Sequence, residues 1–535
     1  MRNTPAYPSE AFRLLRTRRR SRRAPNLPKT ALLFAIMFCN AAASCSRNYS
    51  SGQPGTLNFL IEAMPTNLDP RIGTDAQSEH LDGLIFSSLL AHDAQMKIIP
   101  DLAERWEAPN ALTYVFHLRR DVRFHDGRFL TSADVKFTFD SILSGSVKTP
   151  KRDAFQMVTS LEAPNDATVV FHLREPYASF LWNLTRPGIG IVPRNSGREM
   201  SQRPIGTGPF RFVSMKADEE VVLERNPDYF GDVAKIERVR FRIVPDAIVR
   251  ALELRKGTAD LTLNSLTPDM AATLSQKPDI VVDQKPGTPL AYIAFNCDDL
   301  ILAHKEVRQA FAYATDRTAL ITYLYRGQAR PASSLLPPNH WAYDPNVKQY
   351  AYNPRKAEQL LDVAGFRRGP KGVRFHVTLK TSTEESTRLL SEALADEWKQ
   401  VGVVLDLRPL EFATFYSDIT HGSFQLYTYR WYGGNNDPDI FEYVFSSKRM
   451  PPNGANRGHY RNASLDALLD KERTQMDSEK RRLFLSEIQT MVAEDEPYIV
   501  LWYLDNVCVH RSTLTGIVIP PAGDYEFLET ASEIR

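Results

Sequence analysis

Residues 373–407, VRFHVTLKTSTEESTRLLSEALADEWKQVGVVLDL, decide the fold class of the second half of the chain. Apolar residues alternate along 373–379 and again along 403–407, which predicts two strands. Between them, apolar residues recur at helical spacing until Gly402 ends the helix. A strand, a helix and a second strand in close succession predict a parallel pair with a right-handed crossover, and therefore an α/β fold.

The segments on either side extend this α/β pattern. Asn353 followed by Pro354 predicts the start of a helix, which Gly365 ends. Residues 424–431 predict a further strand, which runs into the polar loop 433–439. Because ligands of open α/β sheets bind at the carboxyl ends of the strands, this loop is a candidate ligand-contacting segment. The alternative is a solvated loop.

Aromatic residues precede the loop, namely Tyr427, Tyr429, Trp431 and Tyr432. Tyr and Trp offer flat apolar area with a polar edge, which suits a site that encloses a polar organic solute. In a strand the first three share one face and Tyr432 lies on the other. The alternative is that the alternate residues enter the core.

The first half of the chain also predicts strands. Residues 56–62 alternate as a half-buried strand, and the sequence Val-Phe-His-Leu-Arg occurs at 115–119 and at 170–174. We interpret this recurrence as sheet geometry and not as a repeat architecture. Thr131 to Asp134 fit a capping box at the start of a helix.

The N-terminal 44 residues are typical of an export signal. A basic stretch at 13–23, an apolar run at 31–39 and small residues at 41–44 lead to Cys45. The apolar run is shorter than the roughly 20 residues that span a bilayer. Cys45 is then either the lipidated first residue of a lipoprotein or lies near a simple secretory cleavage site. An uncleaved anchor is the alternative.

Length and charge limit the number of domains and the kinds of partner that we expect. The chain has 535 residues, which indicates about three domain-sized units, and its 43% of hydrophobic residues is ordinary for a globular protein. After residue 44 the chain holds 57 basic and 63 acidic residues, a net charge of −6. The basic residues in excess belong to the export segment, so we expect no nucleic acid as a partner.

Two cysteines follow Cys45 in the chain, Cys297 and Cys508. In an oxidising compartment they either form a disulfide or remain as separate buried thiols. The sequence leaves both possibilities open.

Motifs for catalysis are absent from the sequence: there is no H-E-x-x-H, Cys pair at metal spacing, Walker A pattern or G-x-S-x-G. His125 beside Asp126 lacks a nucleophile, and Asp126-Gly127 indicates a turn. Gly206-Thr207-Gly208 lacks the third glycine of a phosphate loop and predicts a tight backbone crossing. We therefore expect no catalytic residue, metal or cofactor.

Several patches of the sequence form a characteristic series. The most specific is 116–135, and the others are Leu68-Asp69-Pro70, Pro100 to Trp106, Gly206 to Phe210, Arg225 to Phe230, Phe295-Asn296, Val307 to Phe311 and Thr315-Asp316-Arg317. In content and order these patches resemble the extracellular solute-binding proteins of family 5, the receptors of peptide and nickel importers. The resemblance covers essentially the whole chain after residue 55.

The resemblance implies a two-lobed periplasmic binding protein-like α/β fold, with an extra domain inserted in the first lobe and a ligand cleft between the lobes. The domain ranges that it implies are 45–88, 203–288 and 503–535 for lobe 1, 89–202 for the inserted domain, and 289–502 for lobe 2. Closure of such a cleft excludes water and marks the loaded state.

The function implied is that of a monomeric receptor, not an enzyme, in the periplasm or tethered by lipid to the outer face of the cell membrane. It delivers a peptide or peptide-like solute to an ABC permease with separate ATPase subunits. The family also carries nickel chelates, opines and saccharides, so a non-peptide solute is an alternative. An envelope sensor or chaperone-like protein on the same fold would also fit, and a secreted hydrolase is a third class of protein to consider.

The resemblance also implies a site in the loop. The expected ligand-binding residues are Trp431, Tyr432, Gly433, Gly434, Asn435, Asn436 and Asp437. Dipeptide receptors of the family hold the peptide's amino group with an acidic residue, which Gly434 replaces in this sequence. Because a buried ammonium needs a charge partner, we expect weak or no binding of simple dipeptides.

Overall fold

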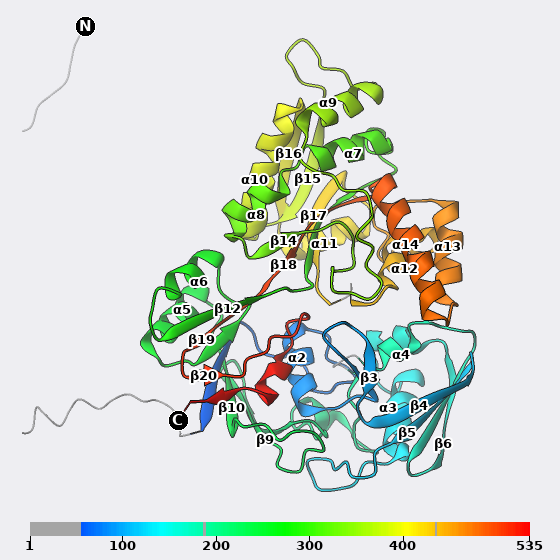
Figure 1. Ribbon diagram of the computed structural model, residues 1–535, viewed down its shortest axis with the longest axis vertical. Coiled ribbons are helices and arrows are strands. Elements are labelled where there is room, and N and C mark those ends of the chain that lie inside the picture. Colours follow the sequence, from blue (N-terminus) through cyan, green and yellow to red (C-terminus); the bar gives the residue numbers. More distant parts are fainter. Residues whose placement is uncertain (1–54, 186–188, 434–435, 535) are drawn as a thin grey trace, which may run out of the picture. The chain divides into compact units, whose positions relative to one another are not determined.

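The computed structural model describes residues 55–185, 189–433 and 436–534 (Figure 1). The predicted export segment, Cys45, Gly434 and Asn435 lie outside the described residues. In the part of the chain that is described, no helix is both long and apolar enough to cross a membrane.

The first sheet has seven strands in the order β12-β19-β11-β1-β10-β9-β8. Its strands are β1 (Thr56–Ile61), β8 (Phe210–Lys216), β9 (Glu220–Arg225), β10 (Arg238–Ile243), β11 (Leu261–Leu263), β12 (Ile280–Lys285) and β19 (Asn506–Arg511). The central strand β1 runs parallel to β10 and β11. The prediction of a strand here is confirmed, but the prediction that it is half-buried is wrong.

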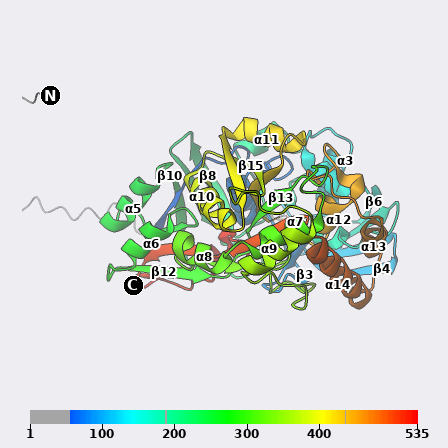
Figure 2. The same cartoon turned by 90° about the horizontal axis from the view of Figure 1, so that it is seen from above.

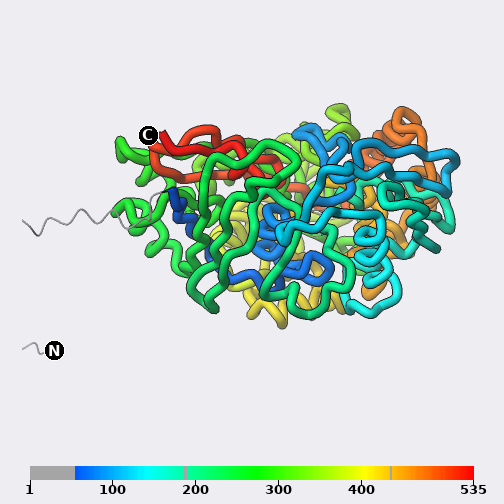
Figure 3. The backbone as a smooth tube through the Cα atoms, turned by 90° about the horizontal axis from the view of Figure 1, so that it is seen from below, coloured from blue at the N-terminus to red at the C-terminus, as the bar shows by residue number. Residues whose placement is uncertain are grey.

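Both faces of β1 are covered. Leu57, Phe59 and Ile61 pack against one set of elements, including α2 (Ala76–Ile85) and the 3-10 helix η6 (Tyr525–Glu529). Leu60 points the other way and packs against α5 (Ala247–Lys256) and α6 (Pro268–Leu274). The C-terminal segment thus returns to the first described elements, as the tube in Figure 3 shows.

The second sheet has six strands in the order β14-β18-β13-β17-β15-β16. They are β13 (Leu290–Phe295), β14 (Ala329–Pro331), β15 (Phe375–Ser382), β16 (Val403–Leu410), β17 (Leu426–Trp431) and β18 (Tyr498–Leu504). β15 runs parallel to β16 along its whole length and parallel to β17 at Leu379 and Lys380. The predicted strand–helix–strand unit with a parallel pair is therefore confirmed.

Helices cover both faces of this sheet, and β13 shows how. Ala291, Ile293 and Phe295 belong to one core and Tyr292 to another, so alternate side chains point to opposite faces. The first face packs against α7 (Lys305–Tyr313), α8 (Arg317–Tyr325), α9 (Pro354–Val363) and α10 (Glu385–Gln400). The second packs against α11 (Phe412–Thr420), α12 (Ile440–Phe445), α13 (Ala463–Arg473) and α14 (Ser478–Asp495) (Figures 1 and 2).

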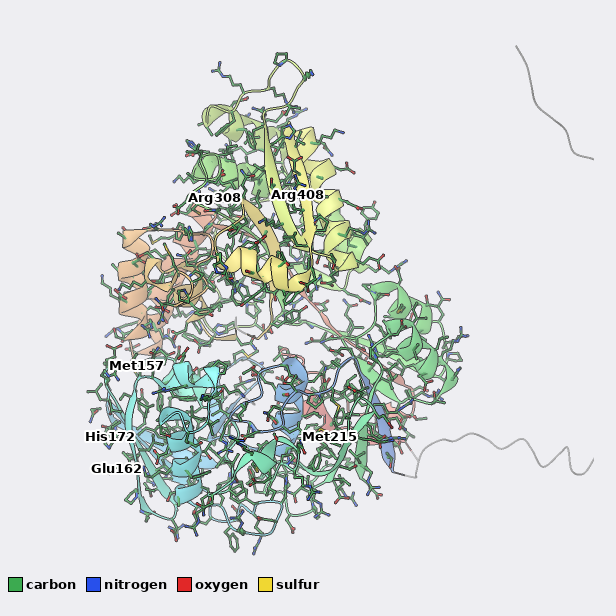
Figure 4. The ribbon with its side chains drawn as sticks, turned by 180° about the vertical axis from the view of Figure 1, so that it is seen from behind. Met157, Glu162, His172, Met215, Arg308 and Arg408 are labelled. Carbon is green, nitrogen blue, oxygen red and sulfur yellow. The ribbon has the colours of Figure 1, made fainter. Side chains whose placement is uncertain are left out.

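A third sheet of four strands has the order β4-β5-β7-β6. It comprises β4 (Ala103–Asn110), β5 (Thr113–Leu118), β6 (Val158–Asn165) and β7 (Thr168–Leu173), with α3 (Ser132–Leu143) and α4 (Phe180–Asn183) sharing its core. The two Val-Phe-His-Leu-Arg stretches are the antiparallel neighbours β5 and β7. The first strand of each hairpin ends with Glu-Ala-Pro-Asn, and each histidine pairs with the glutamate of its own hairpin, as Glu162 and His172 do in Figure 4.

Shorter elements complete the described chain. They are β2 (Leu90–His92), β3 (Ile98–Pro100), β20 (Leu514–Thr515), β21 (Ser532–Glu533), and the 3-10 helices η1 (Pro150–Phe155), η3 (Arg198–Ser201) and η5 (Ser447–Arg449).

Predicted helix caps are present in the structure. The Asn353 side chain accepts from the backbone N–H of Lys356 at the start of α9. Thr131 and Asp134 form both bonds of a capping box at the start of α3. These caps satisfy backbone donors that have no partner within the helix.

Two segments join the first and second sheets. β12 ends at Lys285 and β13 begins at Leu290, while β18 ends at Leu504 and β19 begins at Asn506. The two connections lie side by side, because the N–H of Leu504 donates to the carbonyl of Pro289 at 2.8 Å. Asp505 accepts from Gln284 at 2.7 Å and pairs with Arg330 at 2.8 Å, so both crossings are tied together.

Two motifs noticed in the sequence meet in the first half of the fold. The His125 ring accepts from the N–H of Gly206 and donates to the carbonyl of Gly208, at 3.3 and 3.1 Å. A Cβ on either glycine would lie 2.0 and 2.4 Å from backbone oxygens of the helix α2, so the predicted tight crossing is confirmed. Burial lowers the pKa of His125 to about 4, which keeps the ring neutral in this structural role.

The two described cysteines are free thiols. Cys508 is buried in the core beneath the seven-stranded sheet, and Cys297 packs against the core of the six-stranded sheet. Of the two possibilities that the sequence left open, the structure has separate thiols.

Candidate functional site

A hollow lies where two neighbouring parallel strands end. β15 and β17 both finish at the same edge of the six-stranded sheet, at Ser382 and Trp431. The hollow has a volume of about 390 Å³ and is lined by Ala291, Tyr325, Ser382, Thr383, Glu384, Thr387, Leu390, Phe412, Thr428, Tyr429, Arg430 and Tyr432. This is the position at which open α/β sheets bind ligands.

Arg430 is the basic group that lines this hollow, and it is already paired with Glu384, which lines the hollow too. Its guanidinium donates to Glu384 at 3.2 Å and to the hydroxyl of Ser386 at 2.8 Å. Burial alone would raise the pKa of Glu384, but Arg430 and Ser386 outweigh it and lower that pKa. The pair is therefore charged, and it leaves no net charge in the hollow.

The aromatic residues of β17 alternate as predicted. Tyr427, Tyr429 and Trp431 all pack on the core that carries α11 to α14, while Tyr432 is exposed and lines the hollow on the other side. Tyr427 is completely buried, so for this residue the core interpretation is right. Trp431 is half-buried, and its ring stacks on Tyr292 with centroids 6.0 Å apart.

The loop after β17 turns back on itself. Gly433 has φ +68°, a left-handed conformation that favours glycine, and the N–H of Asn436 donates to its carbonyl at 3.1 Å. Asn436 is buried, and its side-chain oxygen has no hydrogen-bond partner among the described residues.

Asp437 is buried and its carboxylate is already engaged. One oxygen accepts from the backbone N–H of Asp439 and from the hydroxyl of Ser179, both at 2.8 Å. Burial and the charge of Asp439 raise the pKa of Asp437 to about 6 against the opposing effect of Arg481. This carboxylate therefore joins two distant parts of the chain.

The contact with Ser179 belongs to a polar cluster that we call the 177–481 cluster. Residues 177–179, next to α4, meet residues from α12, α13 and α14. The bonds are Tyr177 Oη to Asp439 at 2.6 Å, Arg481 Nη2 to Ser179 Oγ at 2.9 Å, Arg481 Nε to Glu472 at 2.5 Å and Ala178 N to the carbonyl of Arg473 at 2.8 Å. The cluster links the four-stranded sheet region to the six-stranded sheet region.

Arg457 is a residue that the sequence reasoning missed. It is only 6% exposed, and its guanidinium lies over the rings of Tyr416 and Trp431, 5.5 and 5.8 Å from their centroids. Its backbone is fixed, because the buried amide of Asn456 donates to two carbonyls and Gly458 passes so close to Phe295 that a Cβ would not fit. No motif in the sequence marks this position.

Possible metal ligands occur throughout the described residues. Among the described residues, no three His, Cys, Asp or Glu side chains are grouped so as to hold a metal ion. A larger hollow of about 1130 Å³ lies between α3 and β6, but the Lys136 and Asp140 that line it pair with each other at 2.8 Å. We therefore place the candidate site at the ends of β15 and β17.

A family comparison agrees with this architecture. The model of the bacterial extracellular solute-binding proteins, family 5 Middle, matches residues 97–451. This chain belongs to that family. Its fold is the two-lobed α/β fold of periplasmic binding proteins.

Similar proteins cover nearly the whole chain. Di/tripeptide-binding protein 1 of Pseudomonas aeruginosa is 27% identical over 94% of this chain and 98% of its own length. Heme-binding protein A of Haemophilus influenzae is 29% identical over 93% of this chain and 97% of its own. The crystal structure of NikZ from Campylobacter jejuni in complex with Ni(L-His) covers 90% of this chain and 100% of its own, with 26% identity and a TM-score of 0.76.

In this solute-binding protein, the predicted site residues lie in three different surroundings near the end of β17. Tyr432 lies at the 390 Å³ hollow, Trp431 faces Arg457 on the opposite side of the strand, and Asp437 lies in the 177–481 cluster. Gly434 and Asn435 lie outside the described residues.

Proposed function

We propose that this protein is the solute receptor of an ABC importer, and that it captures a peptide or peptide-like solute and delivers it to a membrane permease. Family membership supports this role, and relatives named for di- and tripeptides support the solute class. The observation that carries the proposal is the aromatic, polar-lined hollow at the ends of β15 and β17. No chemistry is assigned to this chain, and the ATPase belongs to separate subunits.

The proposed ligand site is the segment 431–437 with the walls of the hollow. Trp431 and Tyr432 supply flat surfaces on the two sides of the strand end. Gly433 permits the turn, and the side-chain oxygen of Asn436 has no partner among the residues that the structure describes. Asp437 acts in the proposal by holding residues 177–179 near the site and not by direct contact with the solute.

The domain division is part of the same proposal. Lobe 1 comprises 45–88, 203–288 and 503–535, an inserted domain 89–202, and lobe 2 289–502. The separation of the seven-, six- and four-stranded sheets supports this division, and the two tied connections at Pro289 and Asp505 suit a hinge. In this account the 177–481 cluster forms when the lobes close on a solute.

The proposed location is the periplasm or the outer face of the cell membrane, and the proposed state is a monomer. The basic, apolar and small-residue pattern before Cys45 supports cleavage there, with or without a lipid on Cys45. The intact mass of the exported protein tests cleavage, and retention of residues 13–23 would contradict it.

A non-peptide solute is the second candidate function. The absence of an acidic side chain at Gly434 favours it, and so do relatives named for heme and for a nickel–histidine complex. A peptide receptor without this acid would accept longer or amine-blocked peptides.

Calorimetric titration with a set of dipeptides, each with its N-acetylated form as control, separates these candidates. We expect weak or no binding by the natural protein, because a buried ammonium would lack a charge partner. The Gly434→Asp variant is expected to gain affinity about tenfold or more for the free dipeptides but not for the acetylated ones. Tight dipeptide binding by the natural protein would show that another acid holds the amine.

A further inference from the structure

Arg457 differs from the other buried arginines of this protein. Among the described residues, the buried arginines are Arg71, Arg250, Arg308, Arg317, Arg457 and Arg481. Arg71 and Arg481 pair with carboxylates, and Arg250, Arg308 and Arg317 donate to backbone carbonyls. The Nε and Nη1 of Arg457 have no hydrogen-bond partner among the described residues.

Acidic side chains that contact the segments around Arg457 are paired with other cations. Glu442 pairs with Arg449 at 2.7 Å, and Asp298 pairs with His459 at 2.9 Å and Arg461 at 2.6 Å. No ion pair of Arg457 is present in the described part of the chain. A buried charge without a counter-ion is costly, so this guanidinium is suited to an anion that arrives from outside.

A second donor beside Arg457 also lacks an acceptor. The indole N–H of Trp431 is buried and has no partner among the described residues. The buried hydroxyl of Tyr292 lies beside that of Tyr427, which also neighbours Arg457. The rings of Trp431 and Tyr292 stack at 6.0 Å, and the Arg457 guanidinium lies over the Trp431 ring. The Nε and Nη1 of Arg457 and the indole N–H of Trp431 are therefore neighbouring donors with no carboxylate among the described residues to accept from them.

Partly exposed aromatic rings lie beside this place. Tyr416 lies under the guanidinium and is 41% exposed, and Tyr443, next to Trp431, is 44% exposed. Phe412 stacks on Tyr416 and is 50% exposed. Half-exposed rings of this kind give a solute apolar contact while its charged end reaches inward.

We propose that Arg457 and the indole N–H of Trp431 form an anion subsite that binds a carboxylate of the solute. This inference rests on the proposed receptor function and narrows its solute class to carboxylate-bearing compounds with an apolar or aromatic part. Arg430 is not an equivalent anion site, because its guanidinium already donates hydrogen bonds to Glu384 and Ser386. A guanidinium suits this task, since it presents several donors in the plane that a carboxylate matches.

The test compares acids with their amides. The probes are N-acetyl-Ala-Ala-Phe, N-acetyltyrosine and benzoate, each titrated beside its primary amide by calorimetry. The variants are Arg457→Met and, as the matched control, Arg461→Met, whose side chain is exposed and pairs with Asp298. We expect the natural protein and Arg461→Met to bind at least one acid about tenfold more tightly than its amide. Arg457→Met is expected to lose this preference.

The thermal stability of the solute-free protein provides a second readout. Removing an unpaired buried charge is expected to leave the Tm of Arg457→Met unchanged or raised by about 1–2 °C. A fall of several degrees would show that Arg457 supports the fold, and it would overturn the subsite.

The remaining outcomes distinguish the subsite from the receptor function. Equal binding of acids and amides by the natural protein, or an acid preference that survives in Arg457→Met, overturns the subsite and leaves the receptor function intact. If neither the probes nor any solute from the producing cell binds, the receptor function fails and the subsite fails with it.

Discussion

Three of the six buried arginines among the described residues are held by backbone carbonyls. Arg308 donates to the carbonyls of Leu302 and Asp495, and Arg317 donates to those of Val500 and Tyr350. Near them lies Glu496, which is 4% exposed and has one carboxylate oxygen without a described partner. At the residue scale, this acid is the clearest source of a pH-dependent stability.

Burial raises the pKa of Glu496 to about 8, although Arg317 and Arg308 oppose the shift. The folded protein therefore keeps this proton at a pH where the unfolded chain, with a pKa of 4.5, has lost it. Its contribution to stability is full below pH 4.5 and is lost as the pH rises toward 8.

The Glu496→Gln substitution removes this loss of stability at higher pH, because glutamine does not titrate. We expect the stability of the variant relative to the natural protein to rise with pH between about 5 and 8, by at most about 1.4 kcal/mol per unit. Thermal unfolding across this range measures it, with Glu494→Gln, a half-exposed neighbour paired with Lys348, as the control. Parallel pH curves for Glu496→Gln and the natural protein would contradict the assignment.

At the element scale, the sequence predicted what local patterns determine. The capped start of α9 and the alternation along β17 follow from residues within about ten positions of one another. The parallel pair β15 and β16 follows from one continuous strand–helix–strand stretch. The half-buried assignment of β1 failed because Leu60 meets α5 and α6, which local alternation does not reveal.

The candidate site was predicted only in part, for the same reason. The 431–437 segment was found from its place after a strand, but the partners of its side chains come from far along the chain. Ser179 lies 258 residues before Asp437, and no pattern around either residue predicts their contact. Arg457 was missed because the property that distinguishes it is the lack of a partner, which only the packed structure shows.

The 177–481 cluster gives a prediction at the element scale. Tyr177 donates to the Asp439 carboxylate at 2.6 Å, and burial and the Asp439 charge raise its pKa well above 10, so the phenol stays protonated. Tyr177→Phe removes this bond to a charged group. We expect a solute to dissociate about tenfold faster from the variant, because such bonds contribute about 1.5–3 kcal/mol.

Stopped-flow dissociation measures the effect, and Tyr323→Phe, on the exposed surface of α8, is the matched control. An unchanged dissociation rate together with a lowered Tm would show that the contact serves folding and not retention of the solute.

At the scale of the whole molecule, three large sheets in the described residues and two tied connections are consistent with a receptor that binds and releases a solute. The resemblance of sequence patches along the chain predicted the family and the two-lobed fold, and the family match confirms both. The sequence could not decide the state of Cys297 and Cys508, because pairing depends on distances between segments that different sheets position.

Native mass spectrometry of the protein, purified without denaturation from the cells that produce it, tests the central claim most directly. We predict a chain that carries one small molecule, which is lost on collisional activation and whose mass identifies a carboxylate-bearing solute. A chain that is bare under these gentle conditions, and whose Tm no peptide, metal chelate or heme compound raises, would contradict the account.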